Sequence, residues 1–124
     1  FGIPAPLKAW IDNIVREGKT YTFGEGRNAK RVYGLLHNKL VVLLQSSGSS
    51  GFQTGGSRET LNHADKAVIA VFTELGVHKF EKASMEGVCE ESDETLERNW
   101  ILCERRLAEI ADRIKVRWRD LHRA

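Results

Sequence analysis

The stretch that decides the fold is LVVLLQSSGSSG at residues 40–51. Its first part, residues 40–44, is a continuous apolar run, which is typical of a strand buried on both faces, as in a parallel sheet. Serine and glycine follow at once and stay frequent up to Ser57. Ligands of open α/β sheets bind beyond the carboxyl ends of the strands, so we expect any binding loop of this chain to begin here.

Segments with helical periodicity flank this strand. Residues 5–17 place apolar side chains at the i, i+3, i+4, i+7 and i+8 spacing of one helix face, and Gly18 suits a C-terminal cap. Residues 59–76 and 93–121 show the same kind of spacing, and the last segment predicts a long amphipathic helix. The apolar seam of that last helix consists of Leu96, Trp100, Cys103, Leu107, Ile110, Ile114 and Trp118.

Two further segments favour extended backbone. Residues 20–23 suit an extended segment that ends in a glycine-rich turn, and residues 77–83 predict a second strand. The resulting order is helix, extended segment, strand, helix, strand, helix, which predicts an α/β fold with a parallel sheet and right-handed crossovers. Two main strands are too few for a complete sheet of this kind, so we interpret the chain as the latter half of a doubly wound domain.

The composition excludes several classes of protein. The chain has 124 residues, of which 41% are hydrophobic and 29% charged, an ordinary balance for one globular domain. No apolar run approaches the roughly 20 residues that span a bilayer, so no membrane partner is expected. A net charge of +2 does not indicate nucleic-acid binding. The basic residues at 113–123 and the acidic ones at 90–94 complement the dipole of one predicted helix.

The cysteines and the first residue also carry information. Cys89 and Cys103 form no CxxC motif, and the four histidines are scattered, so no zinc spacing exists. Two lone cysteines predict reduced thiols and a cytoplasmic location. The sequence begins at Phe1 and its only methionine is Met85, so we expect either processing or an absent N-terminal part.

The loop at residues 45–51 has two interpretations. Its small residues allow a flat ring or a phosphate to approach the backbone closely. Serine hydroxyls and backbone N–H groups can donate to ring carbonyls or to anionic oxygens. A flexible loop that binds nothing has the same composition, and the residues alone leave both alternatives open.

A resemblance to a known family favours the first interpretation. Residues 1–23, FGIPAPLKAWIDNIVREGKTYTF, resemble the FMN-dependent NADH-azoreductase family of flavodoxin-like NAD(P)H:quinone and azo-dye reductases. Some members of that family carry an older label of acyl-carrier-protein phosphodiesterase. Residues 40–49 are similar to the family's strand and Gln-Ser-Arg-Gly-Gly loop, and residues 72–77 to its Phe-Leu-Gly-Val junction. The resemblance extends to about residue 114.

The resemblance implies a fold and a function. The fold is a flavodoxin-like three-layer parallel sheet, with only the C-terminal strands and helices present, so that residues 1–124 are the C-terminal portion of a single domain. The function is transfer of two electrons from NADH or NADPH through FMN to a quinone or azo compound, by a homodimer. The alternative is a truncated, catalytically incomplete fragment that acts only through self-association of its long C-terminal helix.

The resemblance also implies which residues contact the flavin and the substrate. Those that border the cofactor are Phe1, Gln45, Ser46, Ser47, Gly48 and Ser49. Those that line the substrate are Tyr21, Phe23 and Phe52. Ordinary strand packing explains Tyr21 and Phe23 equally well, and an exposed loop aromatic without a role is the alternative for Phe52. No catalytic side chain is expected, because the flavin carries the chemistry.

The sequence departs from the family's pattern in the loop. Ser47 stands where the family has arginine, which removes a cation that could contact the ring, and Ser49 stands where it has its second glycine. The family's phosphate-binding loop follows its first strand, which lies outside this sequence. We therefore expect this chain alone to hold FMN only weakly.

Overall fold

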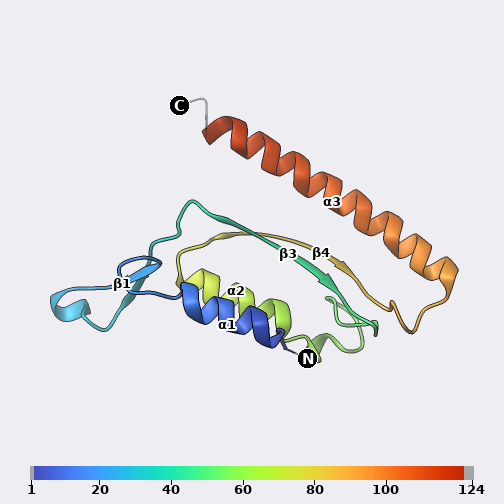
Figure 1. The fold of residues 1–124 in the computed structure, drawn as a ribbon, viewed down its shortest axis with the longest axis horizontal. Coiled ribbons are helices and arrows are strands. Elements are labelled where there is room, and N and C mark those ends of the chain that lie inside the picture. The colour runs from blue at the N-terminus through green and yellow to red at the C-terminus, as the bar shows by residue number, and fades with distance from the viewer. Residues whose placement is uncertain (1, 122–124) are drawn as a thin grey trace. The chain divides into compact units, whose positions relative to one another are not determined.

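The structure, a computed structural model, describes residues 2–121. The helices are α1 (Ala5–Ile14), α2 (Ala64–Glu74) and α3 (Asp93–Leu121), and the strands are β1 (Tyr21–Phe23), β2 (Val32–Gly34), β3 (Leu40–Ser46) and β4 (Lys79–Met85) (Figure 1). The chain divides into two compact units. The first holds the described residues up to Val42 with Phe52–Phe80, and the second holds Leu43–Gly51 with the described residues from Glu81 onward.

Helix α1 begins where the sequence predicts and ends three residues earlier. Pro4 is its N-cap residue and a further proline occupies the first turn, where no N–H partner is needed. The helix ends at Ile14 because the Thr20 hydroxyl donates to the Ile14 carbonyl at 2.8 Å and accepts the Arg16 N–H at 3.0 Å. Gly18 follows with a φ of +72°, a conformation that glycine adopts at little cost.

The first unit contains a hairpin that the sequence did not reveal. Strands β1 and β2 pair antiparallel, with Tyr21 opposite Gly34. Gly34 lies against the end of α2, and the Leu36 N–H donates to the Leu75 carbonyl at 2.8 Å. The buried apolar side chains of this unit are Ile11, Phe52, Val68, Phe72, Leu75 and Val77.

Helix α2 is shorter than the predicted 59–76. A separate 3-10 turn covers Glu59–Leu61, and Asn62 then takes an extended ψ of 95°. The buried Asn62 side chain donates to the Phe52 carbonyl at 3.1 Å, so it holds the preceding loop instead of continuing a helix.

Strands β3 and β4 are hydrogen-bonded neighbours in a two-stranded sheet, and their arrows run in the same direction in Figure 1. The predicted parallel α/β arrangement is therefore confirmed. The prediction that residues 40–44 are buried on both faces is wrong, because Leu43 is 9% exposed but Leu44 is 66% exposed. β4 is the strand that flanks β3 in this sheet, and the described residues do not bury Leu44.

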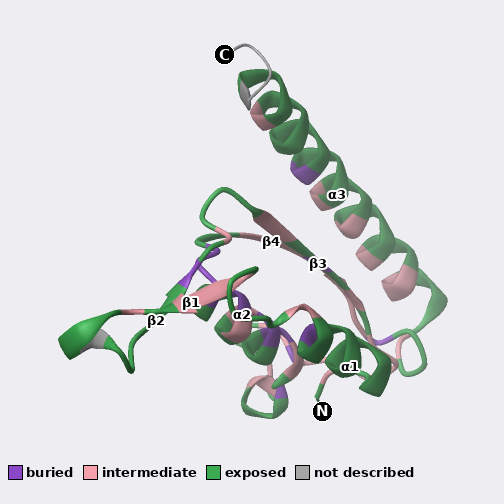
Figure 2. Cartoon of the chain, turned by 60° about the vertical axis from the view of Figure 1, so that its left-hand side comes forward, coloured by how far each residue is buried: buried purple, intermediate pink, exposed green. Residues whose placement is uncertain are grey.

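Helix α3 has the predicted bounds and contacts β4 in the second unit. Arg106 donates to the Lys82 carbonyl at 3.1 Å, and Ile110, one turn further on, is 3% exposed. Most of the helix is exposed (Figure 2). Among residues 2–121, no helix is both long and apolar enough to cross a membrane.

Candidate functional site

The loop after β3 lies beside the segment after β4, at the carboxyl ends of both strands. The Ser47 N–H donates to the Met85 carbonyl at 3.0 Å, and the Ser47 carbonyl accepts the Val88 N–H at 3.1 Å. The Gly48 carbonyl accepts the Cys89 N–H at 2.9 Å. These bonds lie within the second unit and fix the loop at the edge of the sheet where the sequence predicted a binding loop.

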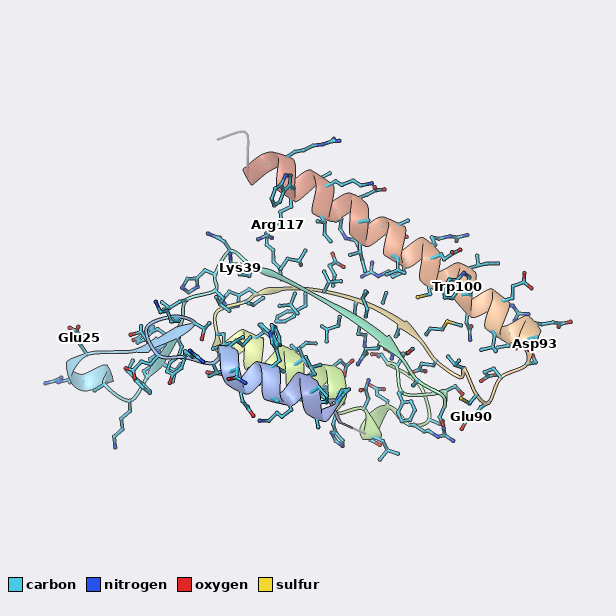
Figure 3. All side chains as sticks on the ribbon, in the orientation of Figure 1. Glu25, Lys39, Glu90, Asp93, Trp100 and Arg117 are labelled. Carbon is cyan, nitrogen blue, oxygen red and sulfur yellow. The ribbon has the colours of Figure 1, made fainter. Side chains whose placement is uncertain are left out.

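Two glutamates hold the far half of this loop. One carboxylate oxygen of Glu90 accepts the Ser49 hydroxyl at 2.6 Å, and the other accepts the Ser50 N–H at 3.2 Å. Glu86 accepts the Gly51 N–H at 2.9 Å. Sequence reasoning placed Glu90 at the start of the last helix, but α3 begins at Asp93 (Figure 3).

Other polar groups of the loop have no partner within the part of the chain that the structure describes. The backbone N–H groups of Gly48 and Ser49 donate to no acceptor there. The side-chain oxygen Oε1 of Gln45 is buried and accepts no hydrogen bond from the described residues. Buried polar groups are normally hydrogen-bonded, so the unpaired Gln45 oxygen is an exception among the described residues of this segment.

Gly48 lies close to the side chain of Cys89. A Cβ atom at this position would lie 3.1 Å from the sulfur of Cys89. Such a contact is tighter than most in proteins, so an alanine here would require the Cys89 side chain to shift by a few tenths of an ångström. Cys89 is an exposed free thiol, and Cys103 is also free.

The predicted substrate residues belong to the first unit. The rings of Tyr21 and Phe23 meet edge to face with centroids 5.5 Å apart, and Phe23 is 42% exposed. Phe52 is 7% exposed, so the alternative of an exposed loop aromatic is wrong. Phe1 lies outside the described residues. The structure thus brings Gln45 to Ser49 together in the second unit, and the substrate roles of the aromatic residues stay predictions.

A charged cluster joins β4 to α3 away from the loop. Arg113 contacts both carboxylate oxygens of Glu81, at 2.7 and 3.1 Å, and Arg106 contacts one of them at 2.8 Å. The hydrogen bond from Arg113 is the main reason that the pKa of Glu81 lies below its ordinary value. Two arginines that satisfy one carboxylate indicate a structural role for Glu81. Among residues 2–121, no group of histidine, cysteine and acidic side chains could hold a metal ion.

Comparison with known proteins identifies relatives of this chain. FMN-dependent NADH:quinone oxidoreductase 1 of Pseudomonas fluorescens (strain Pf0-1) is 33% identical over 115 residues, which are 90% of this chain and 52% of the relative. FMN-dependent NADH:quinone oxidoreductase 2 of Colwellia psychrerythraea is 40% identical over 80 residues, 64% of this chain and 36% of the relative. This chain therefore spans about half the length, or less, of these relatives.

Solved structures of azoreductases have the same fold as this chain. An azoreductase from Bacillus anthracis str. Sterne matches with a TM-score of 0.75 and 24% identity, over 90% of this chain and 50% of that one. An FMN-dependent NADH-azoreductase from B. anthracis str. Ames Ancestor, in complex with FMN, matches with a TM-score of 0.75, 22% identity, and coverage of 91% and 50%. The fold predicted from the resemblance is confirmed. A family model described as a flavodoxin-like fold matches residues 1–100, and this chain belongs to that family.

Proposed function

We propose that this chain is the C-terminal portion of a single flavodoxin-like domain, residues 1–124, in an FMN-dependent oxidoreductase. That enzyme passes two electrons from NADH or NADPH to a quinone or azo compound. The names of the relatives and solved structures support the reaction class. The single observation that carries the proposal is that the segment at the end of β3 has polar groups without a partner among the described residues. They are the buried side-chain oxygen of Gln45 and the N–H groups of Gly48 and Ser49.

The polar groups of the loop fit the ring edge of FMN. The pyrimidine edge of an isoalloxazine presents two carbonyl oxygens and one N–H group between them. Gln45 offers an acceptor for the N–H, and Gly48 and Ser49 offer donors for the carbonyls. A phosphate fits less well, because the carboxylates of Glu86 and Glu90 already occupy the adjacent donors and repel a second anion.

The chain's own residues would bind and orient the ring. When bound, FMN supplies the hydride and electron chemistry. Gly48 keeps the backbone accessible to a flat ring, and the Ser47 hydroxyl, which donates to the Ser49 carbonyl at 2.8 Å, shapes the turn. Ser46 closes β3 and is exposed. No acid or base is assigned, because protein groups position the cofactor in this chemistry and need not transfer a proton.

An FMN titration of the full chain tests the proposal. We expect saturable binding with a Kd above about 1 μM, because residues 45–51 offer neutral hydrogen-bonding groups to the ring but no cation to the phosphate. Gln45→Ala removes the unpaired acceptor and should weaken binding about tenfold. Gln53→Ala is the matched control, since it removes the same amide group outside residues 45–51. Equal affinity of the Gln45 variant and wild type, or no saturable binding, contradicts the assignment.

Activity is tested separately from binding. The proposed reaction predicts NADH or NADPH oxidation that requires both added FMN and a quinone or azo acceptor. Omission of either component is the control.

Because we propose only a portion of the domain, submicromolar FMN binding would contradict the expected weak affinity, even if turnover were observed.

We also propose that the protein forms a homodimer in which a second copy covers part of α3. The supporting observation is the exposure of Trp100, Leu107 and Ile114, at 53%, 37% and 39%, which recur every seven residues along one face of the helix. Exposed apolar residues in one helix favour association. Trp100→Glu should raise the dimer dissociation constant at least tenfold in sedimentation experiments. Leu61→Glu, at a 47% exposed leucine of the 3-10 turn before α2, is the control, and a monomer at all concentrations contradicts the proposal.

A cytoplasmic location is proposed on the state of the thiols. Cys89 and Cys103 are both free, and Cys89 is exposed. Free exposed thiols are typical of a reducing compartment. Fractionation of cells that express the protein at its natural level tests this location, and recovery in an oxidising compartment contradicts it.

A further inference from the structure

We propose that Glu90 is a positioning residue that fixes the loop after β3 and so determines which of its donors can reach a ligand. The inference rests on the proposed function for the identity of that ligand. Glu90 lies between β4 and α3, and its contacts reach a loop that is 40 and 41 residues earlier in the sequence (Figure 3). A single side chain therefore links the segments that follow both strands of the sheet.

The contacts of Glu90 divide the loop into two parts. Its two carboxylate oxygens accept the Ser49 hydroxyl and the Ser50 N–H, at 2.6 and 3.2 Å. Glu86 accepts the next donor, the Gly51 N–H, at 2.9 Å. The rear half of the loop is thus bonded to protein carboxylates, whereas the N–H groups of Gly48 and Ser49 remain unpaired within residues 2–121. Glu90 sets the boundary between these parts.

The link depends on a residue in which this sequence departs from the family it resembles. Ser49 supplies the hydroxyl that Glu90 binds, and it stands where the family's loop has glycine. Glycine has no side-chain donor, so the Ser49–Glu90 bond belongs to this chain's own loop. The same loop has Ser47 where the family has arginine, so it lacks that cation. The charged group that Ser49 and Ser50 contact is instead the negative carboxylate of Glu90. The loop therefore suits an uncharged ring edge better than an anion.

The contact geometry suggests a test on the ligand-free full chain. Amide hydrogen exchange, measured by NMR, reports whether Glu90 holds the Ser50 N–H. Glu90→Ala should speed exchange at Ser50 about threefold to fivefold, because an exposed hydrogen bond contributes about 0.5–1 kcal/mol. Glu90→Gln keeps one acceptor oxygen and should give a smaller increase. Glu91→Gln is the matched control, since it removes the same charge while its side chain lies against Gly87.

FMN affinity provides the second readout. If Glu90 positions the loop, Glu90→Ala should weaken FMN binding about threefold to fivefold relative to Glu91→Gln, with partial recovery in Glu90→Gln. Equal thermal midpoints of the variants show that the fold is intact. If Glu90 instead competes with the ligand for the same donors, Glu90→Ala should bind FMN more tightly, and that result overturns the proposal.

The remaining outcomes separate this inference from the proposed function. Unchanged exchange at Ser50 in Glu90→Ala overturns the positioning role, whatever the FMN affinity. Faster exchange with unchanged FMN affinity also overturns it, because the loop geometry then has no effect on the ligand. If wild type binds no FMN, the proposed function fails, and the exchange rates alone decide whether Glu90 fixes the loop.

Discussion

Replacement of Gly34 by alanine tests the packing of the first unit most directly. A Cβ atom at Gly34 would lie 2.0 Å from the carbonyl carbon of Leu75 and 2.1 Å from the nitrogen of Gly76. Ordinary contact begins at 3.4 Å, so the backbone of one segment has to move by about 1.4 Å. The same movement threatens the hydrogen bond from the Leu36 N–H to the Leu75 carbonyl, 2.8 Å long.

The steric clash and the lost hydrogen bond together determine the expected change in the free energy of unfolding. Overpacking costs about 1–3 kcal/mol and loss of a backbone hydrogen bond about 1 kcal/mol, so Gly34→Ala should lower the free energy of unfolding by about 2–4 kcal/mol. That is a large share of the roughly 5–15 kcal/mol that stabilises a typical domain. The cost is steric, because the backbone of Gly34 has no positive φ.

Urea unfolding measures this change when it is followed by the fluorescence of Trp10 in a background with Trp100→Phe and Trp118→Phe, since all three tryptophans emit. The ring centroid of Trp10 lies 6.3 Å from that of Phe72. Gly18→Ala is the first control, because its φ of +72° is strained for alanine but its surroundings are open, and it should cost about 1 kcal/mol. Gly2→Ala, in open space, should cost less than about 0.5 kcal/mol. A Gly34 variant as stable as the Gly2 variant refutes the packing argument.

The remaining predictions concern α3 and the loop before α2. Arg113 lowers the pKa of Glu81, so the stabilisation from Glu81 is complete above the ordinary carboxyl pKa and is lost as the pH falls through the lowered value. Glu81→Gln should therefore reduce the loss of unfolding free energy at acid pH, measured by urea unfolding at a series of pH values. Ile110→Ala, at a 3% exposed site, should lower the unfolding free energy by about 2–4 kcal/mol, whereas Ile101→Ala, at a 50% exposed site, should change it by less than about 1 kcal/mol in the same urea assay. Asn62→Ala, which removes the hydrogen bond from the buried Asn62 side chain to the Phe52 carbonyl, should cost about 1–3 kcal/mol by thermal unfolding.

The sequence predicts elements well where one periodicity runs without interruption. The bounds of α3 match the prediction because its apolar residues recur at three and four positions over the whole helix. Helices α1 and α2 are shorter than predicted because Thr20 and Asn62 bind backbone carbonyls outside the repeating pattern. Strand β2 was missed because three residues carry no measurable alternation, and its pairing with β1 depends on a turn between them.

In the candidate site, too, features that depend on neighbouring residues were predictable, and contacts between distant residues were not. Its place follows from the apolar strand and the Ser/Gly loop, which are adjacent in the sequence. The role of Glu86 and Glu90 could not be predicted, because each binds a donor at least 35 residues earlier. The one available signal was the presence of acidic residues after the second predicted strand, and of the two glutamates only Glu90 was interpreted, as part of a helix dipole.

Ser49, one of the two departures from the family's loop, is bonded to Glu90, and a double-mutant cycle can measure the consequence of that bond. Ser49→Gly removes the hydroxyl bonded to Glu90, and Glu90→Ala removes its acceptor. If the bond acts as described, either variant alone should speed Ser50 exchange, and the double variant should add little to Glu90→Ala. The coupling free energy should be about 0.5–1 kcal/mol, the value typical of a partly exposed charged contact. Independent effects that add in full would show that Ser49 acts on the loop through its backbone, not through Glu90.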